Sequence, residues 1–383
     1  MKIAMVIDAW DPVVGWWQVH VYNLCKKLIE NQWCEIDLFV RSIKWDNGGI
    51  YNKNEYLLND KLKIIRCGRS KSFFNFFERL FSIFSILFHI IKENKLKQYD
   101  LIHAHTFLWL IPGKLASLSL QIPIVATVHW ANLLDKGKIS PHYCVEKLLL
   151  TKIKYNTIVS VWSSFLKYPN INKNIVVIPN WVNVEEFDCV DIRKREDIFK
   201  ILFVGRLEWT KGIDILIEAV NLLKEGHKES LDGKKVEFHL VGYWYQEDYY
   251  RNLIQKYSLW SYIKFKGLLV WKELIREYKE SSLFVLPSRT EWFGITILES
   301  MAAHVPVLAT RCGWPEDIIQ NWMNWFLIEK ENPNQLHNIL LDFIELRIDI
   351  LNEIIKNWYS TVLSKYNWNS IGEATFFEYK KLL

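Results

Sequence analysis

Residues 288 to 304 read SRTEWFGITILESMAAH, and this stretch decides how the rest of the chain is interpreted. Turn-forming residues lead to Glu291, and the apolar periodicity that follows predicts a helix carrying Glu299. A helix start presents unpaired N–H groups and the positive end of its dipole, so it favours an anion such as phosphate. Carboxylates accept hydrogen bonds from hydroxyl groups, so the two glutamates suggest a ligand that is both phosphorylated and sugar-like. With 43 acidic residues in 383 positions, such a pair also arises by chance.

The composition indicates two domains and argues against several classes of protein. A chain of 383 residues, 50% of them hydrophobic, is long enough for two domains that each have a core. The formal net charge of +5 is too small to indicate nucleic-acid binding, but it permits an anionic ligand or a membrane surface. The six cysteines show no metal-ligand spacing with the ten histidines, which predicts reduced thiols in a cytoplasmic protein. No signal-peptide core precedes Asp8, so we expect no export.

Apolar runs alternate with helical segments and predict two α/β domains with parallel sheets. In the first half of the chain we expect strands at 2–8, 35–40, 63–67, 101–105, 123–129, 156–162 and 174–180. The charged run at 191–197 predicts a linker. The strand pattern then restarts at 200–207, 236–242, 262–267 and 283–288, and helices alone follow from about 335 to 383.

Residues 73 to 91 form an apolar segment rich in phenylalanine and flanked by basic residues. Glu78 and Arg79 interrupt the segment, and it is shorter than the roughly 20 residues that span a bilayer. Two interpretations stay open, a helix that lines the domain core and a helix that lies on a membrane surface.

Basic and histidine residues follow other strands. The run VGRLEWTKG at 204–212 places Arg206 and Lys211 in a strand-to-helix turn, where two cations suit a diphosphate without a metal, although such residues are also common surface charges. His129 ends a strand at the edge where doubly wound sheets bind ligands, and a buried structural histidine fits this position equally. His103 and His105 share one strand face, but without a third ligand they do not indicate a metal site.

In this order, the motifs resemble those of the retaining, nucleotide-sugar-dependent glycosyltransferases of family 4. The resemblance runs nearly end to end, through VVGWWQVHVYNLCKKL, IVATVH, VVIPNWVNVEEF, ILFVGRLEWTKGIDILIEA, LFVLPSRTEWFGITILESMAAHVPVLAT, CGWPEDII and NWFLI. It implies the GT-B architecture of two facing Rossmann-like domains, here expected at 1–190 and 191–361, with a C-terminal helix at 362–383 packing back on the first.

The same resemblance assigns roles to individual residues. Arg206 and Lys211 would bind the donor diphosphate, and His129 would reach the donor sugar. Glu291 would bind the sugar hydroxyls in a positioning role, and Glu299 the nucleotide ribose. The helix start would hold the phosphates beside Phe293, Gly294 and Ile295. The first loop, facing the reacting centre, would contain Gly15 and Trp16.

The implied reaction transfers a hexosyl group with retention from a UDP-, GDP- or ADP-sugar. We expect a lipid-linked or saccharide acceptor in cell-surface glycan or glycolipid synthesis, no cofactor and no metal. The protein would be cytoplasmic or peripheral at the inner face of the cell membrane. Two alternatives stay open: a catalytically impaired sugar-nucleotide-binding protein, and a GT-B sugar-nucleotide epimerase or sugar-phosphate synthase.

Tryptophan stands where the family carries glycine. The chain has 19 tryptophans and 15 glycines, whereas average usage predicts about 27 glycines. The affected positions include Trp16, Trp181, Trp244, Trp292, Trp314, Trp322 and Trp325. An indole does not readily adopt a positive φ or let the backbone approach a phosphate. We therefore hypothesise that a UGA codon, read as glycine in the source organism, is written here as tryptophan. If the tryptophans are real, we predict a destabilised protein or one that does not bind the donor.

Overall fold

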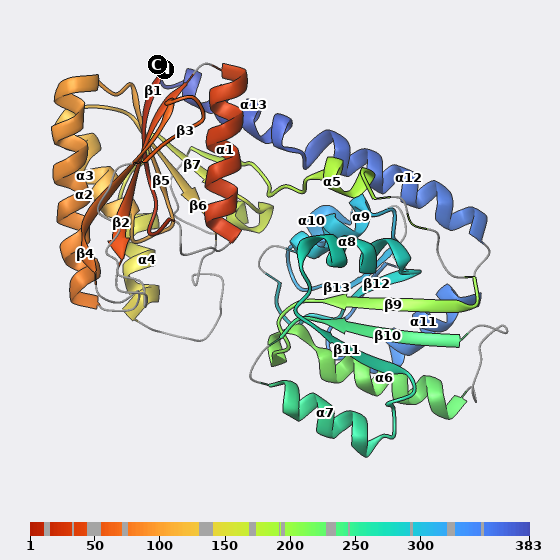
Figure 1. Ribbon diagram of the computed structural model, residues 1–383. Helices are drawn as coiled ribbons and strands as arrows, with labels where there is room; N and C mark the ends of the chain where they lie inside the picture. The colour runs from red at the N-terminus through yellow and green to blue at the C-terminus, as the bar shows by residue number, and fades with distance from the viewer. Residues whose placement is uncertain are drawn as a thin grey trace. The chain divides into compact units, whose positions relative to one another are not determined.

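The computed structural model describes residues 1–10, 16–32, 34–43, 55–70, 76–129, 141–167, 174–190, 192, 196–226, 235–243, 246–291, 294–319, 326–345 and 348–383. The chain divides into two units, shown in Figure 1. Unit 1 comprises Met1–Pro179 with Trp368–Leu383, and unit 2 comprises Asn180–Asn367. The end of the chain therefore belongs to the same unit as its beginning.

Within the described residues, unit 1 is built on an eight-stranded sheet in the order β3-β4-β2-β1-β5-β6-β7-β8. Its strands are β1 (Lys2–Val6), β2 (Glu35–Ile43), β3 (Glu55–Leu57), β4 (Leu62–Ser70), β5 (Leu101–His105), β6 (Ile124–Val128), β7 (Thr157–Ser160) and β8 (Ile175–Val177). Neighbouring strands are parallel, apart from the edge strand β3, which pairs with β4 in the antiparallel direction and was not expected from the sequence. Strands β5 and β6 are buried throughout, as their unbroken apolar runs predict.

Helices cover both faces of this sheet. They are α1 (Trp16–Gln32), α2 (Phe76–Lys97), α3 (Leu110–Leu120), α4 (Pro141–Thr151) and α13 (Trp368–Lys380), with a 3₁₀ turn at Ser163–Lys167. Figure 1 shows α1 on one face and α2 with α3 on the other. Helix α13 packs against α1, and α2 packs against α3.

Helix α2 lines the core of unit 1 through isoleucine rather than phenylalanine. Ile83, Ile86 and Ile90 are buried, whereas the phenylalanines from Phe77 to Phe88 lie on the outer face and are 60–79% exposed. The phenylalanines from Phe77 to Phe88 are therefore not part of the core. Among the described residues, no helix combines the length and the apolar character that crossing a membrane requires.

Unit 2 contains, in its described part, a six-stranded parallel sheet in the order β11-β10-β9-β12-β13-β14. The strands are β9 (Ile198–Val204), β10 (Lys235–Val241), β11 (Ile263–Gly267), β12 (Leu283–Leu286), β13 (Val307–Thr310) and β14 (Leu327–Ile328). The helices are α5 (Val184–Asp188), α6 (Ile213–Gly226), α7 (Glu247–Lys256), α8 (Trp271–Glu280), α9 (Ile295–Ala302), α10 (Pro315–Ile318), α11 (Pro333–Glu345) and α12 (Ile348–Lys365). Two Rossmann-like α/β units confirm the expected fold class.

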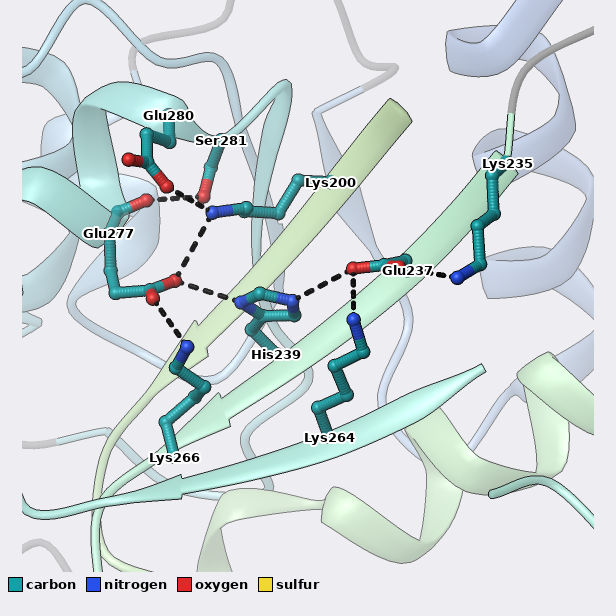
Figure 2. A network of polar contacts seen from close by, with 9 residues as sticks. All are labelled: Lys200, Lys235, Glu237, His239, Lys264, Lys266, Glu277, Glu280 and Ser281. Carbon is teal, nitrogen blue, oxygen red and sulfur yellow. Dashed lines mark hydrogen bonds and ion pairs between the residues drawn. The ribbon is translucent and has the colours of Figure 1, made fainter. Parts of the chain in front are cut away.

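A network of charged side chains links the sheet of unit 2 to α8 (Figure 2). His239 lies at its centre, with Nδ1 2.8 Å from Oε2 of Glu277 and Nε2 3.2 Å from Oε2 of Glu237. Lysines from β9, β10 and β11 complete the network: Lys200, Lys235, Lys264 and Lys266. Burial by itself would raise the pKa values of the two glutamates, but the hydrogen bonds from lysine and histidine outweigh it and lower both to about 2.

Candidate functional site

Lys211 and Glu291 come together in unit 2. Lys211 ends the 3₁₀ turn Trp209–Lys211, and its Nζ lies 2.9 Å from Oε1 and 2.7 Å from Oε2 of Glu291. The two side chains are only 11% and 8% exposed, so little solvent screens their interaction. The residue expected to bind the diphosphate, Lys211, and the residue expected to bind the sugar, Glu291, are therefore in direct contact.

Gly212 allows the turn that carries Lys211 to lie close to β12. Its φ is +64°, and a Cβ at this position would lie 2.0 Å from the carbonyl oxygen of Pro287. A side chain would therefore both clash and strain the backbone. The close contact between the backbone at residue 212 and Pro287 therefore requires glycine. This contact brings Lys211 next to the loop that carries Glu291.

The start of α9 meets the carboxylate of Glu291. The N–H of Gly294 donates to Oε1 at 3.4 Å, and the Ser288 hydroxyl donates to Oε2 at 3.1 Å. Gly294 has φ +56° and caps α9, whose first residue is Ile295. The glutamate therefore accepts hydrogen bonds at the helix end where an anion is expected.

Arg206 follows β9 and is the more exposed of the two expected cations. Its side chain is 51% exposed, and Nη2 lies 2.9 Å from Oε1 of Glu208. The adjoining ends of β9 and β10 touch, since a Cβ on Gly242 would lie 1.9 Å from the carbonyl oxygen of Gly205. Arg206 and Lys211 thus flank one strand-to-helix turn, with Lys211 held by Glu291 and Arg206 beside Glu208.

Arg289 joins the two loops of this site, and the sequence interpretation missed its role. Its guanidinium forms two 2.7 Å hydrogen bonds with the carboxylate of Asp214 and one of 2.7 Å with the carbonyl oxygen of Trp209. It also binds Glu331 and lies 4.4 Å from the ring centroid of Trp209. Burial lowers the pKa of Arg289, but the two carboxylates outweigh it and raise the pKa above its ordinary value. A planar, bidentate cation of this kind fixes the Lys211 turn against the Glu291 loop.

Glu299 is buried within α9. The Tyr278 hydroxyl donates to its Oε2 at 2.7 Å. Burial raises the pKa of Glu299 to about 7, and the hydrogen bond from Tyr278 opposes this rise. Glu299 is consequently a carboxyl group whose charge depends on pH near neutrality.

His129 belongs to a cluster of buried histidines in unit 1. His105 Nδ1 lies 3.1 Å from His129 Nε2, and the two rings stack with centroids 5.3 Å apart. His20 from α1 meets the His129 ring edge-on at 4.8 Å. Burial lowers the pKa of each of these histidines, which favours neutral imidazoles.

The same cluster contains a third imidazole, which the sequence interpretation did not recognise as a possible metal ligand. The ligand nitrogens of His20, His105 and His129 lie within 4.8 Å of one another, close enough for the group to hold a metal ion. His20 was not recognised because it lies on a helix more than 80 residues before His105. His103 is bound otherwise, by the Tyr379 hydroxyl at 2.5 Å and the Thr127 hydroxyl at 2.6 Å.

Several expected site residues lie outside the described part of the chain. Gly15 and Phe293 are among them. Four of the tryptophans that stand where the family carries glycine also lie outside the described residues: Trp244, Trp292, Trp322 and Trp325. Trp16 begins α1, but its side chain is not described. Trp314 is described and buried, and its Cε3 would lie 2.8 Å from a Cβ on Gly294. The indole therefore occupies the space beside the α9 start, where the resemblance implies phosphate.

Comparison with known proteins agrees with the fold. Residues 185–361 match the family model "Glycosyl transferases group 1", and residues 18–186 match "Glycosyltransferase Family 4". An uncharacterized glycosyltransferase of Methanocaldococcus jannaschii is 31% identical over 350 residues, which cover 90% of this chain and 88% of that protein.

Solved structures share the fold at lower identity. Sucrose-phosphate synthase from Thermosynechococcus elongatus superposes with a TM-score of 0.77 at 19% identity, covering 100% of this chain and 98% of the other. The Anabaena protein HepE, in complex with UDP and glucose, has a TM-score of 0.71 at 18% identity and full coverage of both chains. The family models, the relative from M. jannaschii and the two Rossmann-like units lead to one conclusion: the chain belongs to the GT-B glycosyltransferases of the family 4 type.

Proposed function

We propose that this glycosyltransferase transfers a hexosyl group, with retention, from a nucleotide-sugar to a lipid-linked or saccharide acceptor in cell-surface glycan or glycolipid synthesis. The contact of Lys211 with Glu291 at the start of α9 carries the proposal, because it joins a cation for phosphate to a carboxylate for hydroxyl groups. The HepE complex with UDP and glucose supports a UDP-sugar as the first donor to test, ahead of GDP- and ADP-sugars.

Donor binding would replace the internal contact of Lys211. A diphosphate would attract its ammonium, and the donor sugar would offer hydroxyl groups to Glu291 in exchange. As the bond to the leaving phosphate breaks, negative charge develops there, and Lys211 with Arg206 would stabilise it. Glu291 then positions the sugar, while the leaving phosphate helps to remove the proton from the acceptor hydroxyl on the same face. His129 would contact the donor sugar, and Glu299 the ribose.

We further propose that transfer needs neither a cofactor nor a metal ion. Two cations beside the expected diphosphate can balance its charge without a divalent ion. Full activity after treatment with a chelator would support this part of the proposal. Loss of activity that is restored by one metal would contradict it and would direct attention to the cluster of His20, His105 and His129.

The central experiment is a panel of UDP-, GDP- and ADP-sugars tested with saccharide and lipid-linked acceptors. Release of nucleoside diphosphate that depends on the acceptor, with the anomeric configuration kept in the product, is expected. Inversion of configuration would refute the retaining mechanism. Products formed without an acceptor would favour a sugar-nucleotide epimerase instead, and a sugar-phosphate acceptor would favour a synthase.

One observation favours a second candidate, a catalytically impaired protein that binds sugar nucleotides. The buried indole of Trp314 lies beside Gly294, where a phosphate is expected to approach the backbone. Calorimetry that detects donor binding without turnover over the acceptor panel would support this candidate.

A further inference from the structure

The outer face of α2 carries a stripe of phenylalanine that ends in lysine. The stripe residues follow one another at steps of three or four, which places them on one side of a helix. They are Phe77, Phe81, Phe84, Phe88, Lys92 and Lys95. The phenylalanines are 79%, 61%, 60% and 62% exposed, and both lysines are exposed as well.

The opposite face of α2 fixes this orientation. Ile83, Ile86 and Ile90 are buried in the core of unit 1. Two ion pairs hold the flanks of the helix: Arg79 with Asp8 at 2.8 Å, and Glu93 with Lys63 at 2.8 Å. Turning the helix to hide its phenylalanines would expose the isoleucines and break both pairs. The phenylalanine stripe must therefore face solvent or a binding partner.

The neighbouring helix adds further apolar surface. Helix α3 packs against α2 and exposes Leu118 by 63% and Leu115 by 38%. Scattered apolar residues on a protein surface need no explanation, but an ordered row of large ones marks an interaction site. The row on α2 is ordered along about 16 Å of helix.

The charge of the stripe selects its partner. Aromatic side chains of a surface helix settle at the boundary between headgroups and acyl chains, while lysines reach the headgroups and attract anionic lipids. A second copy of α2 fits less well, because parallel pairing would bring lysine against lysine, and in either direction the stripe offers no acidic residue to pair with the lysines. We propose that the α2 stripe binds the surface of a bilayer that contains anionic lipid.

This inference deepens the proposed function, because a lipid-linked acceptor would be met at the surface to which unit 1 binds. It does not depend on the donor chemistry. The stripe contains none of the residues assigned to the donor, so vesicle binding and donor binding can fail separately.

Sedimentation of the full chain with vesicles tests the proposal. The protein should sediment with phosphatidylcholine vesicles containing about one third phosphatidylglycerol, and much less with phosphatidylcholine alone. The double variant Phe81→Ser/Phe84→Ser should weaken vesicle binding about tenfold or more, because it removes apolar surface that would be buried in the bilayer. The core should be unaffected, since both side chains are exposed. Lys92→Gln/Lys95→Gln should weaken it about fivefold for each lysine and reduce its sensitivity to salt.

A matched control lies on α13. Phe377 is 59% exposed, a fraction similar to those of Phe81 and Phe84. Its helix, α13, packs against α1. Phe377→Ser should sediment like the unchanged protein, and all variants should keep their circular dichroism and their affinity for UDP.

Three results would overturn the inference: no sedimentation of the unchanged protein, equal binding by Phe81→Ser/Phe84→Ser, or a dimer in light scattering that this variant converts to a monomer without changing vesicle binding. The last result would assign the stripe to a second copy of the chain.

Discussion

The ammonium group of Lys211 and the carboxylate of Glu291 form an ion pair, with Nζ 2.7 and 2.9 Å from the two carboxylate oxygens. Because both side chains are largely buried, the pairing prevents either charge from being buried without a partner. Its exchange for donor contacts would make the site sensitive to both the phosphate and the sugar of the ligand.

Removing one charge of this pair should affect stability as well as transfer. Glu291→Gln should reduce transfer by at least about 10²-fold, because the sugar loses an ionised acceptor. It should also lower the free energy of unfolding by about 3 kcal/mol, since Lys211 would keep a mostly buried charge without its partner. Denaturant titration and initial rates measure the two effects.

The double variant Lys211→Met/Glu291→Gln is the control for this pair. It should recover most of the lost stability while remaining inactive, because neither buried charge is left alone. Near-normal transfer by Glu291→Gln would remove Glu291 from the site, and no recovery in the double variant would show that the ion pair does not explain the stability loss.

Glu299 should link stability to pH near neutrality. Its pKa is about 7 in the folded protein against 4.5 ordinarily, so the stability it contributes is present below 4.5 and is lost as the pH rises through 7. Glutamine does not ionise, so the Glu299→Gln variant should keep its free energy of unfolding as the pH rises. At pH 8 this free energy should be about 2–3 kcal/mol higher than in the unchanged protein, and at pH 5 the difference should be smaller. Donor affinity should fall about tenfold, because an amide is a weaker acceptor for ribose hydroxyls. A variant that is destabilised at pH 8 would contradict the raised pKa.

The network around His239 should protect the fold against acid. The pKa values of Glu237 and Glu277 are lowered from 4.5 to about 2, so their stabilisation is present above 4.5 and is lost as the pH falls toward 2. Glu277→Gln should lower the free energy of unfolding at pH 7 by on the order of 2 kcal/mol, and the difference should shrink below about pH 3. Glu280, 34% exposed and paired with Lys200, offers a control whose Gln variant should change stability by less than about 1 kcal/mol. Equal losses in the two variants would contradict the special position of Glu277.

The tryptophan hypothesis predicts a defined genetic result. The gene should carry UGA rather than UGG at positions 16, 181, 244, 292, 314, 322 and 325, and mass spectrometry of native protein should find glycine there. Trp314→Gly made in the written sequence should increase donor affinity by opening the space beside Gly294. UGG codons, or indole masses in native peptides, would eliminate the hypothesis.

The sequence predicted those parts of the fold that depend on local patterning. Continuous apolar runs identified β5, β6 and β12, because parallel strands covered on both faces need apolar residues at every position. Strand β3 and strand β14, of three and two residues, were missed because so short a run carries no period. The direction in which the phenylalanines of α2 point was also beyond the sequence, since either apolar face could have met the core.

The sequence assigned residues to a candidate site, and of their contacts only the meeting of Lys211 and Glu291 could be anticipated. Motif order brought Lys211 and Glu291 to one site across 80 positions of sequence. The bidentate contact of Arg289 with Asp214 and the approach of His20 to His129 had no local signal, because each joins elements that become neighbours only in the folded chain. Long-range polar contacts of this kind are what the tertiary structure adds.

The return of α13 to unit 1 has a consequence for how the protein can be divided. Unit 2 is a single uninterrupted segment, Asn180–Asn367. Unit 1 cannot be obtained by cutting the chain once, because a fragment that stops at Pro179 lacks Tyr379, whose hydroxyl contacts His103 inside the core. To express unit 1 with all of its parts, the gene must encode residues 1–179 joined by a linker to residues 368–383.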